Sequence, residues 1–130
     1  MKLTIPFYLH KVGAGFPSPA TDYIEDDIDL NSHLITNAPA TFIIRVQGKS
    51  MTNVGIYDGD LLIVDKSLNP KNFSTVVANV NEELVVKTFI KEKNQSFLTS
   101  GSKEVRDKIN LNDNPEIIIW GVVTYVIHAL

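Results

Sequence analysis

Short runs of β-branched and apolar residues, separated by turn residues, fill the chain from Thr41 onward, and this pattern constrains the fold most. Runs of about four to eight such residues between turn signals are typical of β-strands. The predicted strands are residues 41–47, 61–64, 75–80, 83–90, 95–99 and 117–127. No stretch has the periodicity and length of a long amphipathic helix. The sequence therefore predicts an all-β fold, a compact and mostly antiparallel β-barrel or sandwich.

The N-terminal part of the chain has a different character. Residues 13–20 are rich in small residues and proline, which favour an extended backbone and cannot continue a helix. We therefore expect residues 1–39 to form an extended N-terminal arm and residues 40–130 to form one β domain.

Two local signals predict turns. Asp29 and Asn31 are both suitable caps for a short helical turn that runs toward residues 34–35 and ends before Pro39. Residues 81–82, Asn-Glu, are expected to form a hairpin turn, although they lack the glycine that the tightest hairpin turns prefer.

Charge and cysteine content argue against several function classes. The chain has 12 Lys+Arg and 15 Asp+Glu, a net charge of −3, so it has no basic field for direct nucleic-acid binding. It has no cysteine, which excludes disulfides, thiolate nucleophiles and thiolate metal sites. His10, His33 and His128 lack metal-ligand spacing, and none accompanies a Gly-x-Ser-x-Gly motif. We therefore expect neither a metal nor a cofactor.

Ser50 follows the first predicted strand of the β domain and precedes a turn-rich stretch, residues 52–55. In such a turn a hydroxyl can point outward, and the backbone N–H groups of Lys49 and Ser50 can face a developing oxyanion. Serines in turns also cap backbone groups, so a purely structural role stays open.

Lys87 lies within the predicted strand 83–90 and has apolar residues on both faces around it. Apolar surroundings disfavour the charged ammonium, and a neutral amine can act as a base. Alternatively, the side chain lies at a sheet margin and extends its charge into water. If Ser50 and Lys87 meet in space, they form a nucleophile-and-base pair that needs no histidine.

Five segments, in one order along the chain, resemble the LexA-like self-cleaving serine peptidases, peptidase family S24. These segments are residues 15–23, 48–51, 58–65, 86–87 and 121–123. The Ser-Met turn alone is also similar to bacterial signal peptidases. The resemblance covers the chain from about residue 13 to its end, and it implies a LexA-like or signal-peptidase-like β fold.

Carried over to the matching positions, the resemblance implies that Ser50 is the nucleophile and Lys87 the general base. It implies a scissile bond between Ala14 and Gly15, so the arm is the substrate and the protein cleaves itself. The small Ala14 side chain suits a shallow pocket, and Gly15 lets the backbone bend into a cleft.

The resemblance also implies partners. A RecA filament on single-stranded DNA would stimulate cleavage, the protein would be a homodimer, and its shortened form would serve a UmuC-like Y-family DNA polymerase in SOS translesion synthesis. The chain has no room for a helix-turn-helix domain before the cleavage bond, so repressor function is not expected. Its first residues match neither a signal peptide nor a membrane span, so we expect a cytoplasmic protein.

Two alternative functions stay open at this point. One is a processing peptidase that acts on other proteins. The other is a non-catalytic interaction module of the same fold, in which Ser50 and Lys87 merely pack.

Overall fold

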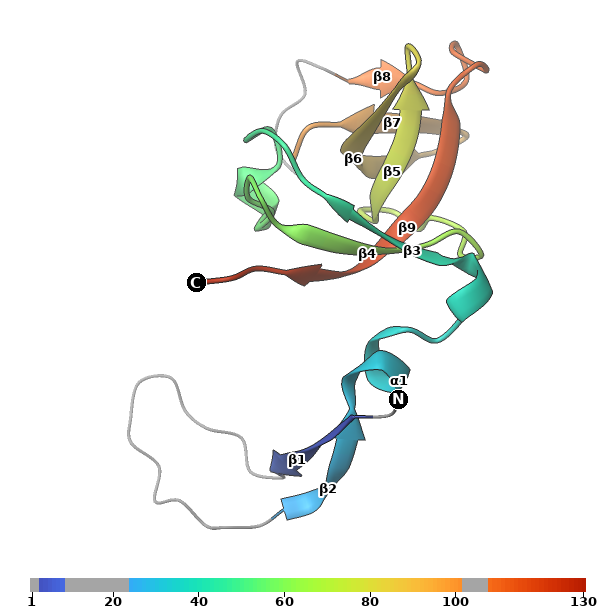
Figure 1. The fold of residues 1–130 in the computed structure, drawn as a ribbon. Helices are drawn as coiled ribbons and strands as arrows, with labels where there is room; N and C mark the ends of the chain where they lie inside the picture. Colours follow the sequence, from blue (N-terminus) through green and yellow to red (C-terminus); the bar gives the residue numbers. More distant parts are fainter. Residues whose placement is uncertain (1–2, 9–23, 102–107) are drawn as a thin grey trace. The chain divides into compact units, whose positions relative to one another are not determined.

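The computed structural model describes residues 3–8, 24–101 and 108–130 (Figure 1). The chain divides into two compact units, residues 1–36 and 37–130, and each is described by itself. The expected cleavage site, Ala14–Gly15, lies outside the described residues.

The first unit holds a small antiparallel sheet that the sequence did not predict. Strand β1 (Thr4–Tyr8) pairs with strand β2 (Ile24–Asp29), and Pro6 lies opposite Asp27. Proline has no N–H to donate to a partner strand, and it is tolerated here because each strand of a two-stranded sheet has an outer edge. The segment expected as an extended arm therefore also contains a short pair of strands.

The predicted helical turn is confirmed as α1 (Leu30–Leu34). Asp29 caps it, because its side chain accepts a hydrogen bond from the backbone N–H of Asn31 at 3.1 Å. The hydroxyl of Ser32 donates a second hydrogen bond to the Asp29 carboxylate at 3.0 Å. Of the two caps that the sequence allowed, the structure assigns the role to Asp29.

The second unit is built on one antiparallel sheet of seven strands in the order β3-β4-β9-β5-β6-β7-β8 (Figure 1). Its strands are β3 (Thr41–Arg45), β4 (Leu61–Asp65), β5 (Thr75–Val80), β6 (Glu83–Glu92), β7 (Gln95–Thr99), β8 (Ile109–Asn110) and β9 (Ile118–Ile127). Two short 3-10 helices, η1 (Ala38–Ala40) and η2 (Thr52–Val54), precede β3 and β4. The all-β prediction is confirmed, and only the two-residue β8 was not predicted in this unit.

Two clusters of buried apolar side chains stabilise this sheet, and β5 contributes to both. Val77 belongs to the first cluster together with Leu62 of β4. Its neighbour Val76 belongs to the second cluster together with Leu98 of β7. Successive side chains of a strand point to opposite faces, so one strand can supply two cores.

Candidate active site

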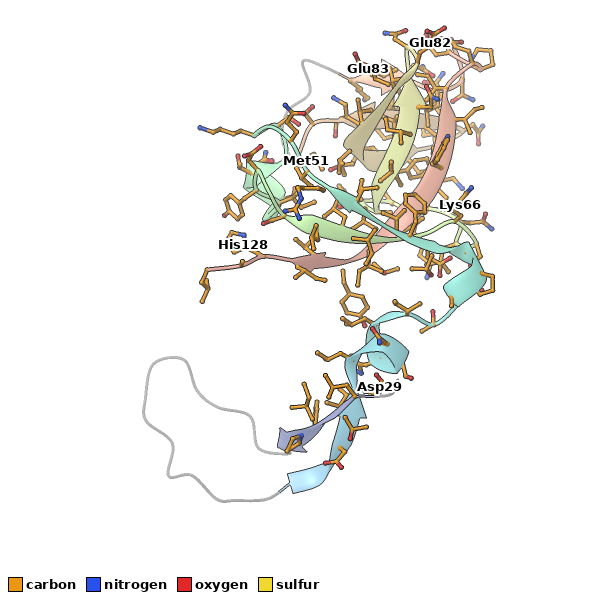
Figure 2. All side chains as sticks on the ribbon, viewed as in Figure 1. Asp29, Met51, Lys66, Glu82, Glu83 and His128 are labelled. Atoms are coloured by element: carbon orange, nitrogen blue, oxygen red, sulfur yellow. The ribbon has the colours of Figure 1, made fainter. Side chains whose placement is uncertain are left out.

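Ser50 lies in the turn between β3 and η2, where two features fix the backbone. Gly48 has a φ of +101°, a left-handed conformation that residues with a side chain rarely adopt. Its N–H donates a hydrogen bond to Oδ1 of Asp58 at 2.8 Å. Met51 is 2% exposed and packs in the first cluster (Figure 2), whereas Ser50 is exposed. The turn therefore anchors itself through Met51 and leaves the serine at the surface.

Hydrogen bonds fix the orientation of the peptide group that joins Lys49 to Ser50. The carbonyl oxygen of Lys49 accepts hydrogen bonds from the N–H of Thr52 at 3.2 Å and from its hydroxyl at 3.0 Å. The described residues contain no cis peptide bond, and the C=O and N–H of a trans peptide point in opposite directions. The Ser50 N–H therefore points away from Thr52. The oxyanion role of the Lys49 and Ser50 N–H groups stays a prediction.

A second turn supports the chain just before Ser50. The N–H of Val46 donates to the carbonyl of Asp60, and the N–H of Gly59 donates to the carbonyl of Val46, both at 2.8 Å. Nη1 of Arg45 donates to the carbonyl of Gly59 at 3.1 Å. The Asp-Gly-Asp segment, one of those that carried the sequence resemblance, thus holds the serine turn in place.

Asp60 stays ionised within this support. Asp60 is buried, with only 3% of the residue exposed. The hydrogen bond from the backbone N–H of Tyr57 lowers its pKa most, burial acts in the opposite direction, and His128 lowers the pKa further. The net pKa is below the ordinary value, so the carboxylate is charged at neutral pH.

Lys87 lies on β6, opposite Val76 of β5. Its side chain is half-buried, and Nζ donates a hydrogen bond to Oγ of Ser100 at 2.8 Å. Ser100 follows β7, whose last residue, Thr99, pairs with Thr88. Sequence reasoning missed Ser100, because only the pairing of β6 with β7 brings it beside Lys87 and no spacing in the sequence marks it.

Ser50 and Lys87 line one cavity of about 470 Å³. The lining residues come from two stretches of the chain, residues 44–51 without Lys49 and residues 83–87. Arg45 and Glu83 are the other charged residues among them. The two predicted side chains, far apart in the sequence, therefore reach the same cavity.

Strand edges border this cavity. Residues 83–86 of β6 pair with β5, whereas the pairing of β6 with β7 begins at Thr88. On the other stretch, β3 pairs with β4 along one edge only. Within the described residues, an extended peptide that entered the cavity would meet strand edges that no other strand covers, and such edges can pair with an added strand.

Among the residues that the structure describes, no group of three or more His, Cys, Asp or Glu is arranged to hold a metal ion. None of the helices there is long and apolar enough to cross a membrane.

An antiparallel β domain with a surface serine and a half-buried lysine on one cavity is typical of serine peptidases that work without histidine. Comparison with protein families agrees, since the model described as Peptidase S24-like matches residues 6–124. The chain belongs to this family. The resemblance inferred from the sequence segments is thereby confirmed.

Within the family, the chain is similar to UmuD-like proteins. It is 41% identical to Protein ImpA of Salmonella typhimurium over 124 residues, which cover 95% of this chain and 83% of the relative. It is 38% identical to Protein MucA of Escherichia coli over 122 residues, 94% of this chain and 83% of the relative. It is 36% identical to Protein SamA of Salmonella typhimurium strain LT2 over 125 residues, which cover 96% of this chain and 86% of the relative.

Proposed function

We propose that this protein is a serine peptidase that cleaves its own N-terminal segment between Ala14 and Gly15. The observation that carries the proposal is one cavity that is lined both by Ser50, in the turn after β3, and by Lys87 of β6. Membership of the Peptidase S24-like family supports the same chemistry.

The proposed reaction needs only groups of this chain and water. The neutral amine of Lys87 takes the hydroxyl proton of Ser50, and Oγ attacks the carbonyl carbon of Ala14. The oxyanion that forms accepts hydrogen bonds from the N–H groups of Ser50 and Lys49. The C–N bond to Gly15 then breaks, the Gly15 nitrogen takes the proton from Lys87, and water releases residues 1–14 from Ser50.

Because the substrate is a segment of the same chain, a serine–lysine pair is sufficient for the proposed cleavage. A segment of the same chain has a high effective concentration at the cavity, so a modest nucleophile can complete a single turnover. The uncovered strand edges beside the cavity, at residues 83–86 and on β3, suit a substrate that binds as an extended strand.

The proposed biological role follows the UmuD-like relatives. We infer a cytoplasmic homodimer whose cleavage a RecA filament on single-stranded DNA stimulates, and whose shortened form joins a UmuC-like Y-family polymerase in SOS mutagenesis. Similarity to ImpA, MucA and SamA supports this role. The net charge of −3 is compatible with a protein that reaches DNA through partners.

The test follows the intact mass of the purified protein at mildly alkaline pH, with and without activated RecA filament. We expect loss of residues 1–14, faster at higher pH because more of the amine is neutral, and faster with the filament. Ser50→Ala and Lys87→Ala should each slow cleavage by about 1,000-fold or more. Ser96→Ala and Lys91→Ala, on β7 and β6, are matched controls and should cleave at the wild-type rate.

Two outcomes would contradict the proposal. Cleavage that persists in Ser50→Ala would identify a contaminating protease rather than this site. A wild-type protein that stays intact under every condition would favour the non-catalytic interaction module.

A further inference from the structure

The turn that follows β7 connects the two halves of the candidate site. We call residues 99–101 the 99–101 turn. Oγ of Ser100 accepts the hydrogen bond from Nζ of Lys87 at 2.8 Å, and the N–H of Gly101 donates to Sδ of Met51 at 3.1 Å. Met51 is the immediate neighbour of Ser50. One turn therefore contacts both the lysine side chain and the serine turn.

The 99–101 turn is itself closely constrained. The hydroxyl of Thr99, 6% exposed, donates to the carbonyl of Gly101 at 2.8 Å. Gly101 has a φ of +77°, and a Cβ there would lie 2.0 Å from Oδ1 of Asn53 in η2. The left-handed backbone therefore favours glycine, and a Cβ there would also displace the Asn53 side chain.

We propose that Ser100 is a positioning residue for Lys87, and that the 99–101 turn, seated on Met51, sets the lysine amine relative to Ser50. This inference rests on the proposed self-cleavage. A neutral amine has two N–H bonds and one lone pair. With one N–H held by Ser100, rotation about the Cε–Nζ bond is restricted, and this limits the directions in which the lone pair can point.

The surroundings of the amine are consistent with this assignment. Arg45 and Glu83 are the other charged residues that line the cavity. The Ser100 hydroxyl lies within hydrogen-bonding distance of Nζ, at 2.8 Å. Ser100 contacts the proposed base, so we expect its effect on the reaction to act through Lys87.

The experiment compares the self-cleavage rates of Ser100→Ala, Ser100→Thr and the wild type across a range of alkaline pH, without RecA. Ser100→Ala should lower the rate by about 10- to 100-fold, as a misplaced catalytic group does. Ser100→Thr keeps the hydroxyl and should restore most of the rate.

Controls separate this inference from the proposed function and from misfolding. Ser96→Ala, on the same strand, should match the wild type, and thermal unfolding of all variants checks the fold. A Ser100→Ala rate within about twofold of wild type would overturn the positioning role while cleavage remained dependent on Ser50. Equal losses in Ser100→Ala and Ser100→Thr with lowered thermal stability would also overturn it. Cleavage in Ser50→Ala would instead reject the proposed function itself.

Discussion

The carboxylate of Asp60 contacts residues from two parts of the chain near the candidate site. One oxygen accepts the N–H of Tyr57 at 2.8 Å, and the other lies 2.5 Å from Nδ1 of His128. The rings of Tyr57 and His128 also contact each other, with centroids 5.3 Å apart. His128, labelled in Figure 2, follows the end of β9, so Asp60 joins the C-terminal residues to the turn that supports Ser50.

The lowered pKa of Asp60 predicts a dependence of stability on acid pH. A carboxyl group whose folded pKa is depressed adds stability above its ordinary pKa of 3.8, and this stability is lost as the pH falls through the folded pKa. Asp60→Asn keeps an oxygen for the Tyr57 N–H but cannot ionise. We expect its free energy of unfolding to be lower than that of wild type at neutral pH and to change less below about pH 4.

Urea unfolding at a series of pH values measures this effect. Asp113→Asn, which removes an exposed carboxylate, is the control and should follow the wild-type pH dependence. Parallel curves for Asp60→Asn and wild type would contradict the assignment.

At the scale of elements, the β5–β6 hairpin delivers Lys87 to the cavity. Asn81 and Glu82 join the strands with φ values of +52° and +67°, and positive φ at both positions is typical of a type I′ hairpin turn. Figure 2 labels Glu82 at this hairpin. The predicted turn is thus confirmed, and Glu82 occupies a position that favours glycine. A side chain in the left-handed region costs about 1–2 kcal/mol.

Glu82→Gly should therefore stabilise the β domain. We expect the free energy of unfolding to rise by about 0.5–1 kcal/mol, since relief of the strained backbone exceeds the entropy that glycine adds to the unfolded chain. Thermal and urea unfolding measure the change. Glu83→Gly is the matched control, because Glu83 begins the strand and glycine there should destabilise. A destabilised Glu82→Gly would contradict the strain argument.

At the scale of the whole β unit, two cores share one strand. Val77 of β5 lies in the cluster of Leu62, and Val76 in the cluster of Leu98. The chain's single tryptophan, Trp120, reports on the first cluster. Its ring packs edge-on against Phe42, with centroids 6.3 Å apart. Phe42 packs against the first cluster. Because the two cores share strand β5, we expect them to unfold together.

Leu98→Ala tests this cooperativity. Leu98 is fully buried in the second cluster, whereas Phe42, the neighbour of Trp120, packs against the first. We expect a loss of about 2–5 kcal/mol in the free energy of unfolding. Trp120 fluorescence and far-ultraviolet circular dichroism should give the same lowered midpoint. Leu68→Ala, at a 45% exposed leucine, should cost less than about 1 kcal/mol. A fluorescence midpoint that stays at the wild-type value would mean that the two cores unfold separately.

The strands of the β unit, the Asp29 cap and the hairpin at residues 81–82 could be predicted from sequence, because β-branched runs, capping side chains and turn residues act over a few residues. The pairing of β1 with β2 and the two-residue β8 could not. Strand β8 is too short for a local pattern, β2 is mostly acidic and β1 contains Pro6, and each depends on a partner strand elsewhere.

By itself the sequence determined where most strands of the β unit lie and which serine and lysine are candidates for chemistry. Only the tertiary structure decided that Ser50 and Lys87 line one cavity, and that Ser100, Met51 and Gly101 connect their supports. The reason is strand register: a shift of one residue in the pairing of β6 would turn Lys87 to the opposite face of the sheet. Register is set by the packing of the whole domain, and no short segment contains that information.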